Sequence, residues 1–163
     1  EAVSSEAAPA GAAQEVGGPA SSWATMCLAL APGRTACSLV QRQVLENGAI
    51  LMALEISGLE AAAGGGGTVP LLTLTAPLGT RLADGMFLSV DGAELGRLAF
   101  GICRQGGCVA QLAGEEMLAR LRAGIALEVR FMLEVAPDRV EEVSLSAPLD
   151  GISRAVDMIR GAG

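Results

Sequence analysis

The chain has 163 residues, of which 51% are hydrophobic and only 2% aromatic, so its length fits one domain with an aliphatic core. It contains no His, and all 11 basic residues are Arg, which excludes Ser-His-Asp and Cys-His catalysis, Schiff-base chemistry and a P-loop lysine. The formal net charge of −7 opposes binding to nucleic acid.

The first segment, residues 1–22, is rich in Ala, Gly, Ser and Glu and has no apolar periodicity. We therefore expect a flexible leader, or an arm that contacts a partner. The chain begins with Glu and this segment lacks the apolar stretch of a signal peptide. Prior removal of a signal peptide explains this beginning, and an engineered start explains it equally well. Trp23 opens the folded region as a core or disulfide-packing residue, with a partner anchor as the alternative.

Short alternating apolar segments separated by turn residues predict a series of strands. Asn47-Gly48 is the strongest hairpin signal, and the Gly-rich stretch 61–67 is expected to be a loop. Two helical patterns cover residues 115–122 and 149–159. The expected strands cover residues 23–30, 34–45, 49–59, 69–75, 86–90, 95–104, 108–112, 125–135 and 140–145. These elements indicate an all-β sandwich or barrel with one or two short helices. No apolar run is long enough for a transmembrane helix.

The four cysteines, Cys27, Cys37, Cys103 and Cys108, fall into two close pairs. Structural disulfides are the first expectation, while a zinc site of four thiolates and free thiols are alternatives. Four cysteines allow three connectivities. Each pair flanks a turn between two expected antiparallel strands, which predicts the hairpin disulfides Cys27–Cys37 and Cys103–Cys108. Persistent disulfides would place the protein in the periplasm or outside the cell.

The acidic candidates for chemistry are better explained by local structure. Two of them precede glycine, as is ordinary in turns, and two begin an expected helix. A glycosidase-like site would need two carboxylates facing each other across a cleft, which these positions do not predict. The residues considered are Asp84, Asp91, Glu94, Glu115, Glu116, Glu141 and Glu142.

The order of several short motifs resembles the invasion-associated locus B family of Gram-negative bacteria. The motifs are Trp23-Ala24-Thr25-Met26-Cys27, Cys37-Ser38-Leu39-Val40-Gln41, Ala76-Pro77-Leu78-Gly79, Asp84-Gly85, Val90-Asp91-Gly92, Cys103, Gly107-Cys108-Val109-Ala110, Val143-Ser144-Leu145 and Gly151-Ile152. The resemblance implies one exported, immunoglobulin-like β-sandwich domain over residues 23–160, with no catalytic residues to carry over. Members of the family are often basic, whereas this chain is acidic.

The sequence therefore favours a non-enzymatic protein, periplasmic or secreted, that binds another protein as an accessory subunit of an envelope or membrane complex. A mean hydropathy of +0.47 is high for a soluble domain. A surface poor in charge, as in a subunit of a larger assembly, would explain this value, and the Ala content alone is the alternative explanation. We expect no cofactor, metal or nucleic acid as ligand. The alternative class is an enzyme, either a carboxylate-based hydrolase or a thiol–disulfide exchange protein.

Overall fold

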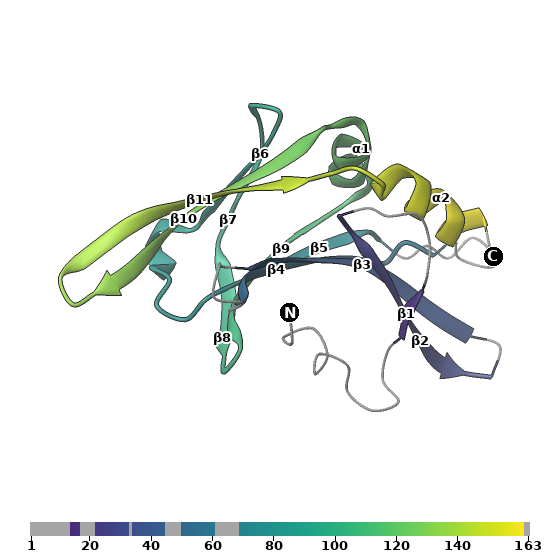
Figure 1. Cartoon of the computed structure of the whole chain (residues 1–163), viewed down its shortest axis with the longest axis horizontal. Coiled ribbons are helices and arrows are strands. Elements are labelled where there is room, and N and C mark those ends of the chain that lie inside the picture. The colour runs from purple at the N-terminus through teal and green to yellow at the C-terminus, as the bar shows by residue number, and fades with distance from the viewer. Residues whose placement is uncertain (1–13, 17–21, 33, 45–49, 61–68, 162–163) are drawn as a thin grey trace.

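A computed structural model describes residues 14–16, 22–32, 34–44, 50–60 and 69–161. They form two antiparallel sheets packed face to face, with two short helices at one end of the molecule (Figure 1), so the expected β-sandwich is confirmed. The strands are β1 (Gln14–Val16), β2 (Ala24–Ala31), β3 (Arg34–Val44), β4 (Ile50–Ser57), β5 (Leu71–Ala76), β6 (Met86–Val90), β7 (Ala93–Leu98), β8 (Phe100–Arg104), β9 (Gly107–Ala113), β10 (Ala126–Ala136) and β11 (Arg139–Pro148).

The larger sheet has seven strands in the order β1-β2-β3-β4-β5-β9-β8. Successive side chains of a strand point to opposite faces, and in β5 the alternation is complete. Leu72, Leu74 and Ala76 are fully buried, whereas the residues between them are partly exposed. The inward face is therefore one wall of the core.

The smaller sheet has four strands in the order β11-β10-β6-β7 and forms the opposite wall. Leu127, Val129 and Phe131 on β10 are buried, together with Met86 and Leu88 on β6. With Phe131 as its only fully buried aromatic side chain, the described core is essentially aliphatic, as the composition predicts.

A corner of the sandwich replaces the single strand expected over residues 95–104. The chain pairs with β6 as β7, passes through Ala99, and then pairs with β9 as β8 in the other sheet. Both pairings contain a register shift, a feature of strands that change sheets. The two sheets approach closely here, since a Cβ at Gly96 would lie 3.5 Å from Leu112 Cδ2. The apolar alternation continues through the corner, so it gave no sign of the break.

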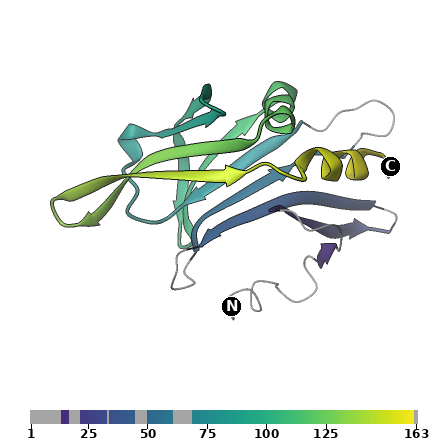
Figure 2. The same ribbon diagram turned by 45° about the horizontal axis from the view of Figure 1, so that its top comes forward.

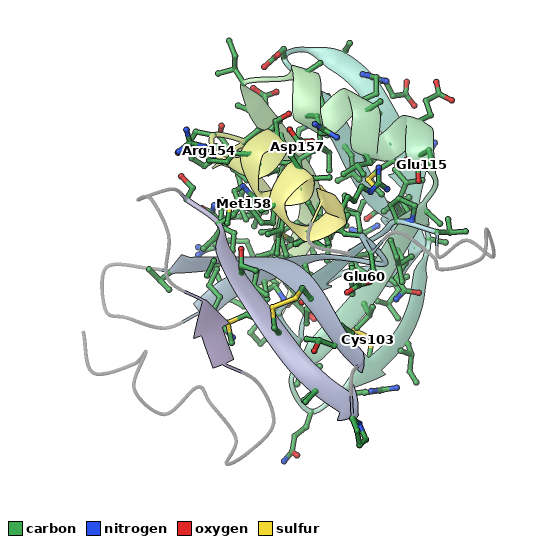
Figure 3. The ribbon with its side chains drawn as sticks, turned by 90° about the vertical axis from the view of Figure 1, so that its right-hand side faces the viewer. Glu60, Cys103, Glu115, Arg154, Asp157 and Met158 are labelled. Atoms are coloured by element: carbon green, nitrogen blue, oxygen red, sulfur yellow. A yellow bond between two sulfur atoms is a disulfide. The ribbon has the colours of Figure 1, made fainter. Side chains whose placement is uncertain are left out.

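Two helices, α1 (Glu115–Ala123) and α2 (Ile152–Gly161), close one end of the core. Leu118, Leu121 and Val156 are buried beneath them. Ion pairs join the helices: Arg122 to Asp157 at 2.7 Å and Arg160 to Glu115 at 2.9 Å. Figure 3 shows the two helices from this end. Within the described residues, neither helix is long and apolar enough to cross a membrane.

The N-terminal segment differs from expectation at one point. Gln14–Val16, predicted to lie in a flexible leader, form β1 and extend the larger sheet beside β2. Three residues are too few to produce a strand pattern in the sequence. The rest of the leader (1–13 and 17–21), the Asn47-Gly48 hairpin and the Gly-rich stretch 61–67 lie outside the described residues.

Candidate functional site

Both disulfides lie in the seven-stranded sheet and have the predicted connectivity. Cys27 on β2 is directly opposite Cys37 on β3, and Cys103 on β8 is directly opposite Cys108 on β9. All four thiols are therefore used, and the zinc-site and free-thiol alternatives are wrong. The two cross-links lie near opposite lateral sides of the sheet, where strands have fewer neighbours.

Glu60 completes the end of the sheet next to the first disulfide. Strand β4 stops at Ser57, so the backbone N–H of Cys37 has no strand partner on that side. It donates a hydrogen bond to Glu60 Oε2 instead. A buried or partly buried N–H is costly when unpaired, so we assign Glu60 a structural function. Sequence reasoning missed this residue because nothing in its neighbourhood indicates a long-range cap.

The acidic candidates are dispersed over the fold, and four of them form ion pairs, whereas no ion pair is seen for Glu94 or Glu116 among the described residues. Asp84 pairs with Arg81 at 3.1 Å, Glu115 with Arg160, and Glu142 with Arg130 at 3.3 Å. Glu141 pairs with Arg139 at 3.4 Å. Within the part of the chain that the structure describes, no group of three His, Cys, Asp or Glu residues is placed to hold a metal ion.

Asp91 has a purely architectural role in the turn between β6 and β7. Its φ of 51° is left-handed, a conformation that Asp tolerates better than most residues. Its carboxylate accepts hydrogen bonds from the backbone N–H groups of Ile125 and Ala126 at 3.0–3.2 Å. These bonds fasten the turn to the start of β10.

Trp23 is a buried core residue, which is the first of the two roles expected for it. Its side chain is only 5% exposed, and its indole Nε1–H donates to Pro148 O at 2.7 Å. Gln41 Nε2 donates to the same carbonyl oxygen at 3.2 Å. Both bonds connect the seven-stranded sheet to the end of β11, so Trp23 helps to join the two layers.

Three exposed apolar side chains lie instead on the β10–β11 hairpin and on the segment before β6 that pairs with it. Strand β6 pairs with β10 only as far as Phe131. Beyond that residue, the segment that precedes β6 pairs with β10 instead, with Thr80 opposite Leu133. Glu134 N donates to Gly79 O at 2.9 Å, and Arg81 N donates to Met132 O at 2.8 Å. Leu78, Leu82 and Val135 are 56%, 50% and 41% exposed on this arm and beside it. We call these three residues the hairpin-end patch.

The arm that carries this patch extends beyond the remainder of the sandwich, as Figures 1 and 2 show from two directions. It lies at the end of the molecule opposite to α1 and α2. Exposed apolar side chains on a backbone fixed by hydrogen bonds are a feature of protein contact sites. The sequence carried a weak sign of the patch, since Leu78 and Leu82 are bulky residues within turn segments.

A second surface is the face of the seven-stranded sheet that points away from the other sheet (Figure 1). We call it the seven-stranded outer face. Two adjoining hollows of about 430 and 220 Å³ lie on it and share Arg42, Ala53 and Thr75. Small, hydroxyl and aliphatic side chains form most of the lining: Met26, Leu28, Ala36, Ser38, Val40, Ser57 and Thr73.

The fold and these surfaces define a β-sandwich that is cross-linked by two disulfides. The family model for the invasion associated locus B (IalB) protein matches residues 23–160. The chain therefore belongs to the IalB family, as the motif order predicted.

A solved structure, the invasion associated protein B of Bartonella henselae, has the same fold. It superimposes with a TM-score of 0.69 at 22% sequence identity, covering 87% of this chain and 92% of the Bartonella chain. No curated protein sequence matches the chain.

Proposed function

We propose that this protein is a non-enzymatic accessory subunit that binds another protein in the periplasm or outside the cell, through the hairpin-end patch. The observation that carries the proposal is the exposure of Leu78, Leu82 and Val135 on a projecting, hydrogen-bonded arm. The other large apolar side chains that are exposed among the described residues lie on separate elements: Leu28, Val44, Val69, Ile102, Ile125 and Met158.

Contact with a protein would remove apolar surface from water, which stabilises a complex by about 25 cal/mol per Å². The arm needs little ordering before it binds, because Gly79, Thr80 and Arg81 are already held against β10. Thr80 adds a hydrogen bond from Oγ1 to Pro77 O at 2.7 Å, which fixes the turn that presents Leu78. Preorganisation of this kind lowers the entropic cost of association.

Two cross-strand disulfides and no remaining free thiol support a location in an oxidising compartment. In the source bacterium, the protein should fractionate with the periplasm or the medium. Alkylation of thiols in intact cells before lysis should label none of its four cysteines. Recovery from the cytoplasm with reduced cysteines would contradict this part of the proposal.

The partner is expected to be a component of a periplasm-facing membrane or envelope complex. The test is affinity capture from the envelope fraction of the source bacterium, with the tagged protein as bait and mass spectrometry as the readout. A double variant, Leu78→Ser with Leu82→Ser, should lose the partners that the unaltered protein retains.

Ile125→Ser is the matched control, since Ile125 is 79% exposed yet lies at the other end of the sandwich, between α1 and β10. The control should capture the same partners as the unaltered protein. Equal capture by the double variant would show that the patch is not the contact site. Capture of nothing by any of the baits, when each is folded by circular dichroism, would contradict the accessory-subunit function itself.

A further inference from the structure

Two charged side chains, Arg42 and Glu55, lie in the middle of the seven-stranded outer face. They belong to adjacent strands, since Val40 is opposite Glu55 and Arg42 is opposite Ala53 in the β3–β4 register. Both side chains are exposed, and both line the larger hollow. Neither forms an ion pair with any described residue, whereas Glu141 and Glu142 on β11 each pair with an arginine.

Among the residues of β2, β3, β4, β5 and β9 whose side chains the structure describes, no other charged residue lies on this face, although Glu60, just after β4, also lines the larger hollow. The floor consists of short side chains, among them Ser38, Ala53 and Thr73, while Met26 and Leu28 on β2 rise at one side. Short side chains allow a second layer to approach closely, and packed sheets lie about 10 Å apart. Covering this face would therefore remove few charges from water.

We propose that the occupant of this face is a second copy of the same chain, forming a two-fold symmetric dimer through sheet-on-sheet contact. A two-fold axis in the plane of contact, midway between Arg42 and Glu55, places each residue opposite the other residue of the partner copy. The two unpaired charges then form two equivalent ion pairs across the interface. An isologous contact requires self-complementarity of this kind.

The size of the face agrees with this arrangement. Five strands spaced about 4.8 Å apart, each contributing residues about 3.3 Å apart, give a planar area of roughly 600 Å². Two such faces together reach about 1,200 Å², the lower limit of a standard stable interface. The dimer leaves the hairpin-end patch free, so the inference does not depend on the proposed function.

The experiment is sedimentation equilibrium of the full chain over a range of micromolar concentrations. The unaltered protein should sediment as twice the monomer mass of 16.4 kDa. Arg42→Glu brings two carboxylates together at each contact, and Glu55→Arg brings two guanidinium groups together. Each single reversal should raise the dimer Kd by about tenfold or more. The double variant Arg42→Glu/Glu55→Arg restores opposite charges and should dimerise again.

Arg97→Glu is the control for net charge, because it changes the charge by the same amount on the exterior of the other sheet. It should leave the dimer Kd unchanged. Thr73→Arg places a large charged side chain on the floor of the face and should dissociate the dimer independently of the ion pairs. A monomeric unaltered protein would overturn the inference. Dimers that survive both single reversals and Thr73→Arg would also overturn it, because the contact would then use another surface.

Discussion

The two sheets have similar inward faces but different outward faces. The exterior of the four-stranded sheet is charged: Phe87 lies between Arg97 and Arg130, whose guanidinium carbons are 4.7 and 5.4 Å from its ring centroid. Arg130 also pairs with Glu142, and Ser89 bonds Glu128 at 3.4 Å. On the exterior of the seven-stranded sheet, Arg42 and Glu55 are the only charges among the described side chains of β2, β3, β4, β5 and β9.

This difference cannot arise from the needs of the fold, because both sheets bury alternate residues in the same core. Strand pairing accepts charged and uncharged residues on a solvated face. The sparsely charged exterior of the seven-stranded sheet agrees with the dimer contact that we propose, whereas the four-stranded exterior has the cross-strand pairs of a surface that faces water. Both disulfides belong to the sheet with the sparsely charged exterior.

If the inward faces of the two sheets belong to one core, equal truncations on each should be equally destabilising. The comparison is between Leu74→Ala on β5 and Leu127→Ala on β10. Both side chains are fully buried and lose the same atoms. Each change should lower the free energy of unfolding by about 3 kcal/mol through lost burial and a cavity. Urea denaturation monitored by circular dichroism measures both. If one variant is much less affected, the two walls do not share a single core.

Removing either disulfide of the seven-stranded sheet should lower the free energy of unfolding. Replacing Cys27 and Cys37 by Ser opens a loop with a sequence separation of 10 and should cost about 3 kcal/mol. Replacing Cys103 and Cys108, with a separation of 5, should cost about 2 kcal/mol. The unfolding midpoint in denaturant provides the comparison. The reverse order would show that native contacts around the second pair outweigh the loop-length effect.

Asp91→Ala should weaken the four-stranded sheet through its β6–β7 turn. The change removes the acceptor for two backbone N–H groups and places Ala at a left-handed φ, for an expected loss of about 1–2 kcal/mol. Asp91→Asn keeps one oxygen acceptor and tolerates this conformation, so it should lose less. Thermal unfolding of the two variants checks the order.

Phe87→Leu should have the smallest effect. It removes the ring that faces Arg97 and Arg130 while keeping an aliphatic side chain, and exposed cation–π contacts contribute about 0.5–1 kcal/mol each. The expected loss is about 1 kcal/mol. The same substitution after Arg97→Ala and Arg130→Ala should cost clearly less. An unchanged cost in that background would show that the arginines do not stabilise the ring.

The sequence predicted the strands well wherever alternation was local, as in β5 and β6, and the hairpin disulfides followed from their turns. It did not predict the division between β7 and β8, because apolar alternation is unchanged when a strand moves to another sheet. The roles of Trp23 and Glu60 depend on Pro148 and Cys37, which are distant in the sequence. The two proposed contact surfaces arise from the pairing of separate strands, which a linear pattern does not contain.

The corner between β7 and β8 also determines how the sandwich can open. On that side the chain passes directly from one layer to the other, so the layers are hinged covalently. On the other side, Trp23 and Gln41 donate hydrogen bonds to Pro148 O, so the layers are joined there by non-covalent contacts. Partial opening should therefore separate the two sheets along β11, while they stay joined at the corner between β7 and β8. In hydrogen exchange, the amides of β11 near Pro148 should lose protection before those of β6 and β5, which lie deeper in their sheets.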